Sequence, residues 1–197
     1  MTPRFDTFEP FVKALELRAH GLDRPFVVAP DGRCAAGKTM LAAALAQVTD
    51  AAVIEGDDFY TGGVGLRTEP PAALVGACID WRQQRIVLEA LRAGRQASWH
   101  AFDWEAFDGE LCAELTVRAP RPIVILEGIY SARPELADLI DLSVLVRADE
   151  SVRGSRLLAR EGVIGPWDRQ WHFAEEYYFE FIRPPMSFHM AASDMPL

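Results

Sequence analysis

Short apolar runs and segments with helical spacing alternate along this chain. The apolar runs show no polar alternation and favour β-branched residues, which is typical of strands covered on both faces of a parallel sheet. They lie at residues 26–29, 51–54, 123–126 and 142–146. Helical spacing is found at residues 5–20, 40–47, 80–94, 150–160 and 170–182. This order predicts an α/β fold with three layers and a parallel central sheet.

Other segments complete the predicted organisation. Residues 98–102 and 111–117 read as two further short strands. A leading helix is expected within residues 1–21, which end in a glycine that stops the helical pattern. A small lid is expected at about residues 150–170. We expect the whole chain, residues 1–197, to form one domain.

Composition and charge narrow the function classes. Of the 197 residues, 50% are hydrophobic, which is enough to build a sizeable core. No apolar stretch approaches about 18 residues and no signal-type N-terminus is present, so we expect a soluble protein without a membrane partner. The formal net charge of −9 argues against a nucleic-acid partner. Three cysteines at unrelated spacings suggest no disulfide framework, which fits a reducing cytoplasm, and a homo-oligomer is compatible with the sequence.

Residues 32–39 read GRCAAGKT and fit the phosphate-loop pattern G-x-x-x-x-G-K-[ST]. They stand between an apolar run and a helical segment, as this pattern requires. Backbone N–H groups of such a loop, with the positive end of the following helix, form an anion site. Lys38 is one of only two lysines and would hold the outer phosphates, while the Thr39 hydroxyl would face magnesium. The loop predicts ATP and Mg²⁺ as cofactors, with nucleotide contacts from Gly32, Arg33, Cys34, Ala35, Ala36, Gly37, Lys38 and Thr39.

Acidic residues follow two other predicted strands. Asp57 and Asp58 come shortly after residues 51–54, and Glu127 comes directly after residues 123–126. In open α/β sheets, ligands bind at the carboxyl ends of the strands. A carboxylate there can take a proton from an attacking hydroxyl or hold Mg²⁺. We therefore expect Asp57 as the base and Thr39, Asp57 and Glu127 around the metal; turn formation or helix capping is the alternative for these acids.

Arg153, Arg156 and Arg160 lie three and four residues apart and would form one positive stripe on a helix. In an acidic chain, one such stripe suits one polyphosphate. The alternative is ordinary ion pairs with neighbouring glutamates. We expect Arg153 and Arg156 to bind the nucleotide and Arg160 to act in catalysis together with Lys38 and Asp57.

Six segments together resemble the uridine-cytidine kinase branch of the small P-loop kinases, whose relatives include phosphoribulokinase, bacterial pantothenate kinase and nicotinamide riboside kinase. In chain order they are GRCAAGKT at 32–39, GDDFY at 56–60, CIDW at 78–81, AFDWEAF at 101–107, LEGIY at 126–130 and LVRADESVRGSRLLARE at 145–161. The resemblance covers most of residues 25–183. It implies a P-loop NTPase fold with a small lid, in which Asp57 is the general base for a nucleoside hydroxyl.

The resemblance also implies substrate contacts. Tyr60 would lie near the substrate, Asp80 would hold the ribose hydroxyls, and residues 101–104 would wall the base pocket. His100 is a further candidate because it lies between two aromatic residues. Each has a structural alternative: Asp80 as a helix cap, the aromatic residues as core, and His100 as a structural histidine. The substrate-binding candidates are Tyr60, Asp80, His100, Phe102 and Trp104.

Two positions depart from the family pattern. Phe102 stands where the family has a base-pocket tyrosine, and Phe107 stands near the place of an expected histidine. Two polar contacts that would read a pyrimidine edge are thereby absent, and an apolar wall accepts many rings. The lid has fewer arginines than usual, and no final strand can be identified near residues 192–197.

These observations predict an ATP- and Mg²⁺-dependent phosphotransferase that moves the γ-phosphate to a hydroxyl of a small molecule, with a nucleoside as the favoured acceptor. The nearest alternative is a kinase of the same fold for pantothenate, a vitamin riboside or a sugar. The more distant alternative is a non-catalytic nucleotide-binding sensor.

Overall fold

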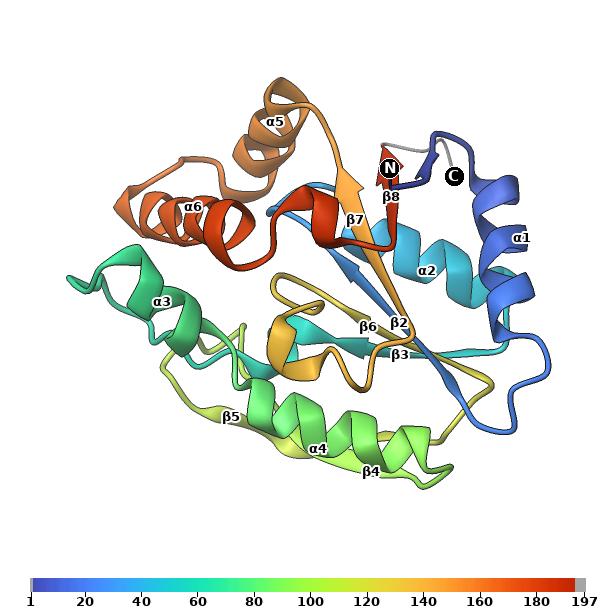
Figure 1. Cartoon of the computed structure of the whole chain (residues 1–197). Coiled ribbons are helices and arrows are strands. Elements are labelled where there is room, and N and C mark those ends of the chain that lie inside the picture. The colour runs from blue at the N-terminus through green and yellow to red at the C-terminus, as the bar shows by residue number, and fades with distance from the viewer. Residues whose placement is uncertain (1, 194–197) are drawn as a thin grey trace.

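The central feature of the computed structural model, which describes residues 2–193, is a six-stranded sheet in which all neighbouring strands are parallel (Figure 1). The strand order is β1-β8-β7-β2-β6-β3. The strands are β1 (Arg4–Phe5), β2 (Phe26–Asp31), β3 (Ala51–Glu55), β6 (Ile123–Glu127), β7 (Leu142–Arg147) and β8 (Met190–Ser193). The α/β class and the parallel sheet predicted from the sequence are confirmed.

Helices cover both faces of this sheet. One apolar core joins alternate sheet residues such as Val28 to α1 (Phe8–Ala19) and α2 (Lys38–Val48). The other core joins the intervening residues, such as Val27, to α3 (Pro71–Cys78), α4 (Trp81–Arg92) and α6 (Pro166–Tyr177). Because successive strand residues point to opposite faces, both sets had to be apolar, which explains the unbroken runs. The fold has three layers, as predicted.

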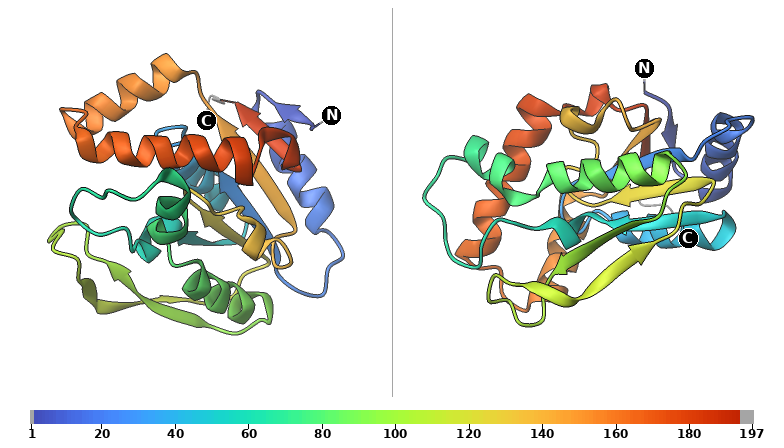
Figure 2. Two further views of the ribbon diagram at one scale, coloured as in Figure 1. Left: turned by 60° about the vertical axis from the view of Figure 1, so that its left-hand side comes forward. Right: turned by 90° about the horizontal axis from the view of Figure 1, so that it is seen from below.

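A small second sheet and a helix pair lie on opposite sides of the molecule (Figure 2). Strands β4 (Ala97–Phe102) and β5 (Leu111–Arg118) pair antiparallel beside α4. Helix α5 (Glu150–Glu161) follows β7 and is connected to α6, which continues into the π-helical turn Tyr178–Ile182. Short 3₁₀ turns occur at Gly56–Phe59, Pro134–Leu136 and Pro185–Ser187.

Several element boundaries differ from the sequence prediction for local reasons. Helix α6 begins at Pro166, four residues before the predicted start, because proline suits the first helical position and the Asp168 carboxylate accepts the Gly165 N–H at 2.7 Å. Helix α1 begins at Phe8 because residues 4–5 pair with β8. Strand β8 itself is present, although the sequence pattern did not identify it. Residues 194–197, at the end of that unassigned segment, lie outside the described residues.

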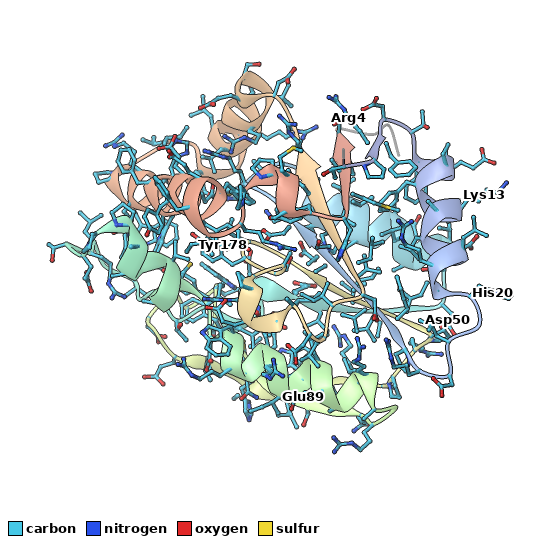
Figure 3. The ribbon with its side chains drawn as sticks, in the orientation of Figure 1. Arg4, Lys13, His20, Asp50, Glu89 and Tyr178 are labelled. Atoms are coloured by element: carbon cyan, nitrogen blue, oxygen red, sulfur yellow. The ribbon has the colours of Figure 1, made fainter. Side chains whose placement is uncertain are left out.

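The leading helix is held by packing at a few positions. Phe11 and Leu15 are fully buried against the sheet, and burial of each side chain contributes about 2–3 kcal/mol relative to exposure. Lys13 and His20 of the same region lie at the periphery in Figure 3. Within residues 2–193, no helix is long and apolar enough to cross a membrane.

Candidate active site

The phosphate loop begins where β2 ends, and its glycines are required by close contacts. A Cβ on Gly32 would lie 2.4 Å from the Val146 carbonyl oxygen of β7, so only glycine fits between these strand ends. Gly37 has a φ of 100°, and α2 begins at the next residue, Lys38. The loop therefore leads its backbone directly into a helix N-terminus, which is the arrangement that binds anions.

Asp31, the last residue of β2, fixes the base of this loop. It is fully buried, and its carboxylate accepts the N–H groups of Gly32 at 2.7 Å, Tyr130 at 3.0 Å and Ala132 at 3.1 Å. It also accepts the hydroxyl of Tyr178 at 2.8 Å, which lies in the interior in Figure 3. Burial raises the pKa of Asp31, and the hydrogen bond from Tyr178 acts in the opposite direction. One carboxylate thus joins the phosphate loop to the loop after β6 and to the π-helical turn that follows α6.

Replacing Asp31 with alanine should lower the free energy of unfolding by about 3 kcal/mol, because three backbone N–H groups and a hydroxyl lose a buried acceptor. Urea denaturation measures this change. The matched control is Asp6→Ala on the surface, where the partner Arg4 is also exposed, and the expected change is within about 0.5 kcal/mol. Equal losses in the two variants would contradict the role given to Asp31.

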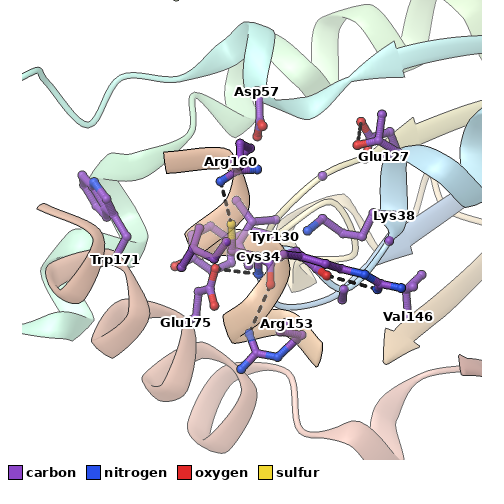
Figure 4. Close-up of a pocket in the computed structure, with 18 of the residues that line it drawn as sticks. Cys34, Lys38, Asp57, Glu127, Tyr130, Val146, Arg153, Arg160, Trp171 and Glu175 are labelled. Carbon is purple, nitrogen blue, oxygen red and sulfur yellow. Dashed lines mark hydrogen bonds between the residues drawn. The ribbon is translucent and has the colours of Figure 1, made fainter. Parts of the chain in front are cut away.

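A cavity of about 1190 Å³ opens at the carboxyl edge of the sheet (Figure 4). It is lined by the phosphate loop, by the segments that follow β3 and β6, and by α5 and α6. The predicted site residues that line it are Cys34, Ala35, Ala36, Gly37, Lys38, Thr39, Asp57, Tyr60, Trp104, Glu127, Arg153, Arg156 and Arg160. Residues distant in sequence therefore meet around one space.

Glu127 and Thr39 lie together at the inner end of this cavity. The Thr39 hydroxyl donates to Glu127 Oε1 at 3.2 Å. Gly56 and Gly128 bring the ends of β3 and β6 into contact, since a Cβ on Gly56 would lie 2.7 Å from the Glu127 carbonyl oxygen. Burial raises the pKa of Glu127 to about 7, against the lowering effect of Lys38. A buried carboxylate beside a hydroxyl is a suitable set of oxygen ligands for Mg²⁺.

Lys38 also lies at the cavity, and its Nζ donates to the Arg33 carbonyl oxygen at 3.1 Å. The side chain thus folds back over the loop. The charge of its ammonium group acts on the buried acids around the loop, because it lowers the pKa of Asp31, Glu127 and Glu175.

The two neighbouring aspartates have different surroundings. Asp58 Oδ2 accepts the Trp99 indole N–H at 2.7 Å, and burial raises the pKa of this carboxyl group. Asp57 faces the cavity, and among residues 2–193 no side chain donates a hydrogen bond to its carboxylate. Its backbone carbonyl accepts the Trp104 indole N–H at 3.2 Å. Of the two acids, Asp57 is therefore the one placed to accept a proton from a ligand.

The two C-terminal helices contact the phosphate loop at Cys34. Arg153 Nη1 donates to the Cys34 carbonyl oxygen at 3.1 Å, and Arg160 Nη2 lies 3.2 Å from Cys34 Sγ. Glu175 Oε1 accepts the Cys34 N–H at 2.9 Å. Arg160 also forms the predicted alternative ion pair, to Glu161 at 2.7 Å. The arginine stripe therefore faces the loop, and these contacts join the loop to α5 and α6.

Aromatic side chains from three segments form one wall of the cavity. Tyr60 lies 4.9 Å from Trp104 and 5.9 Å from Trp171 between ring centroids. Phe107 stacks on Trp104 at 6.0 Å and contacts Trp167 at 5.7 Å. We call these five side chains, Tyr60, Trp104, Phe107, Trp167 and Trp171, the aromatic wall.

Some predicted substrate contacts do not line the cavity. Asp80 caps α4, where its Oδ1 accepts the N–H groups of Arg82 at 3.0 Å and Gln83 at 3.2 Å. His100 lies on the exposed side of β4, because strand alternation turns its neighbour Trp99 inward, and its Nδ1 is 2.9 Å from the Cys112 carbonyl oxygen. Phe102 is buried behind Tyr60 and Trp104, in contact with both.

Two of the predicted nucleotide contacts also lie outside the cavity lining. Gly32 is packed against β7 at the start of the loop. Arg33 forms a long ion pair of 3.8 Å with Glu176 of α6.

Sequence reasoning missed several residues of the site. Trp167, Trp171 and Glu175 are spaced four residues apart on α6 and all line the cavity. The four-residue spacing places these side chains on one face of the helix. An acid on an otherwise aromatic helix face could have indicated that this face lines a site. Asp31 occupies the same strand-end position as the predicted acids and could have been recognised by that criterion.

Comparisons with known proteins agree with the fold. No family model matches the chain. Over 181 residues the chain is 28% identical to uridine kinase-like protein 3 of Arabidopsis thaliana, a match that covers 86% of this chain and 37% of the relative. The chain thus spans little more than a third of that relative.

Two solved structures are similar over almost their whole length. A possible uridine kinase from Bacillus stearothermophilus has a TM-score of 0.68 at 18% identity, covering 93% of this chain and 96% of that one. A candidate fructose transport system kinase from Silicibacter has a TM-score of 0.66 at 19% identity, covering 92% and 97%. The resemblance to uridine kinase-like P-loop kinases is confirmed, and the fold is that of the P-loop kinases.

Proposed function

We propose that this protein is an ATP-dependent kinase that phosphorylates a hydroxyl group of a small molecule, with a nucleoside or a similar ring-bearing alcohol as acceptor. The observation that carries the proposal is the position of Asp57. Its carboxylate faces the cavity that Lys38, Thr39 and Glu127 also line. A protein that only bound the nucleotide would not need an acid at that place.

The donor side of the cavity holds the polyphosphate. The loop amides and Lys38 bind the β- and γ-phosphates, because they lie at a helix N-terminus and carry the local positive charge. Arg153, Arg156 and Arg160 neutralise the charge that spreads over the transferred group. Residues 150–170 act as the lid of a single-domain kinase, since the arginines of α5 already contact the loop.

The donor set also fits magnesium. Among residues 2–193 there is no cluster of three His, Cys, Asp or Glu side chains that could hold a metal alone. Mg²⁺ keeps several waters and binds through one or two carboxylates plus phosphates. Thr39, Glu127 and Asp57 would hold the ion, which would polarise the phosphate oxygens when bound.

On the acceptor side, Asp57 removes the proton from the substrate hydroxyl as its oxygen attacks the γ-phosphorus in line. The bond from that phosphorus to the β,γ-bridging oxygen breaks, and ADP leaves with the electron pair. Tyr60 and Trp104 hold the rest of the acceptor. Water is excluded by the aromatic wall and the arginines above the loop.

The test of this proposal is ADP release from purified protein with Mg·ATP and a panel of alcohols that includes uridine, cytidine, a pyridine riboside, pantothenate and simple sugars. We expect ADP and phosphorylated product in equal amounts with at least one acceptor. Tight ATP binding without ADP release for any acceptor would favour a nucleotide sensor instead.

Binding of Mg·ATP should strengthen as the pH rises from 5 to about 7, because the metal needs the ionised Glu127 carboxylate and the pKa of this group is raised to about 7. Below that pKa, each pH unit should weaken binding by up to about tenfold. Calorimetric titrations at several pH values measure this slope. In the control variant Glu127→Gln the titrating carboxyl group is absent, so any remaining pH dependence of the affinity comes from other groups, including ATP itself. An equal pH dependence in the variant and the unchanged protein would contradict the role given to Glu127.

A further inference from the structure

The basic side chains that line the cavity are confined to one of its sides, whereas acidic side chains line both, including Glu161, Asp168 and Glu175 of α5 and α6. All basic lining residues come from the phosphate loop or from α5 and α6: Lys38, Arg153, Arg156, Arg160 and His172. The segments that follow β3 and β6 contribute only acids among their charged lining residues: Glu55, Asp57, Asp58 and Glu127. The acceptor side is therefore rich in carboxylates and has no basic lining side chain of its own.

The polar groups of the acceptor side are already engaged within the protein. The Tyr60 hydroxyl donates to the Gly63 carbonyl oxygen at 2.7 Å. The Trp104 indole N–H donates to the Asp57 carbonyl oxygen, and Asp58 accepts from Trp99. These groups are not available to read the hydrogen-bonding edge of a neutral ring. The acceptor can therefore be recognised on this side through aromatic surface and negatively charged carboxylates.

Aromatic faces beside carboxylates attract cations. A positive group over the face of a tryptophan or tyrosine gains electrostatic energy from the ring quadrupole, and the gain grows when water is excluded. Trp104 contacts the rings of Tyr60, Phe102 and Phe107 and is still 42% exposed, so part of its surface is open to a ligand. Glu55 and Asp58 line the same cavity. Burial raises the pKa of both carboxyl groups, and the charge of Arg118, which does not line the cavity, acts in the opposite direction.

We infer that the acceptor of this kinase carries a positive charge on its ring or headgroup, held by the exposed part of Trp104 and by the carboxylates of Glu55 and Asp58. The inference rests on the proposed kinase function. It excludes acceptors with a carboxylate or phosphate group, because like charges placed together in a binding site are strongly unfavourable.

A matched pair of acceptors tests the inference. Nicotinamide riboside has a cationic pyridinium ring, whereas its 1,4-dihydro form is neutral and carries the same ribose hydroxyls and carboxamide. We expect the kcat/KM ratio of the cationic to the neutral form to be at least tenfold. In Trp104→Leu and in the double variant Glu55→Gln with Asp58→Asn, the ratio should fall toward one. The control Glu105→Gln changes an exposed acid of the same turn that does not line the cavity, and it should leave the ratio unchanged.

Equal or better use of the neutral riboside would overturn the inference. So would a ratio that stays the same in Trp104→Leu and in the double variant. Turnover of uridine with no turnover of the cationic riboside would overturn it while leaving the kinase proposal standing. Absence of ADP release with every acceptor would count against the kinase itself, and the inference would fall with it.

Discussion

Replacing Lys38 with alanine should abolish phosphoryl transfer and leave the fold intact. Lys38 supplies the positive charge at the inner side of the phosphate loop, and loss of one preorganised group that stabilises transition-state charge costs about 10²–10³ in rate. The helix that it begins is held by other residues, since Leu41, Ala42 and Leu45 are the buried ones. ADP release and thermal melting, measured on the same preparation, separate the two effects.

The chain offers a matched control for this variant. Lys13 is the other lysine of the sequence, and it lies exposed on α1, at the periphery in Figure 3. Lys13→Ala should retain full activity and stability. If Lys38→Ala kept more than about a tenth of the activity, the loop would not hold the reacting phosphates as described.

Replacing Asp57 with asparagine should lower kcat by about a hundredfold or more, the effect expected when a general base is lost. Affinity for Mg·ATP should be largely kept, because the loop, Lys38 and the arginines remain, and Thr39 and Glu127 still hold the metal that Asp57 also contacts. Steady-state turnover at saturating ATP and acceptor gives kcat, and calorimetry gives the ATP affinity. The isosteric change keeps the backbone contact to Trp104, so the cavity wall should be preserved.

The comparison variant is Asp58→Asn, which keeps an oxygen acceptor for the Trp99 indole N–H. With uridine as acceptor it should retain much more activity than Asp57→Asn. The reverse order of the two activities would transfer the role of base to Asp58.

Much of the fold could be predicted because its main elements have local signatures. Strands β2, β6 and β7 are buried on both faces and therefore read as unbroken apolar runs. The edge strand β3 is buried on one face and half-buried on the other, and its first four residues are apolar as well. The phosphate loop is recognisable because its glycines are required by the structure: Gly32 packs against β7, and Gly37 has a φ of 100°. Strand β8 could not be recognised in the same way. It contains four residues, and its place is set by pairing with β7 and β1 across long sequence distances.

The site was predictable where an acid or a loop stands at a strand end, and less so where tertiary packing decides. Glu175 reaches Cys34 only because α6 lies across the phosphate loop. Asp80 and His100 were predicted to contact the substrate but do not line the cavity, because each side chain lies within hydrogen-bonding distance of groups close to it in the fold. The amides of the next helical turn bind Asp80, and the paired strand β5 offers a carbonyl to His100.

The central claim is that the phosphate loop holds a triphosphate whose terminal group faces Asp57. Calorimetric titration of the protein with Mg·ATP tests it most directly. The account predicts saturable binding of one nucleotide per chain, which is weakened strongly in Lys38→Ala and preserved in Asp57→Asn. A titration without heat, accompanied by no shift in the melting temperature at millimolar Mg·ATP, would contradict it.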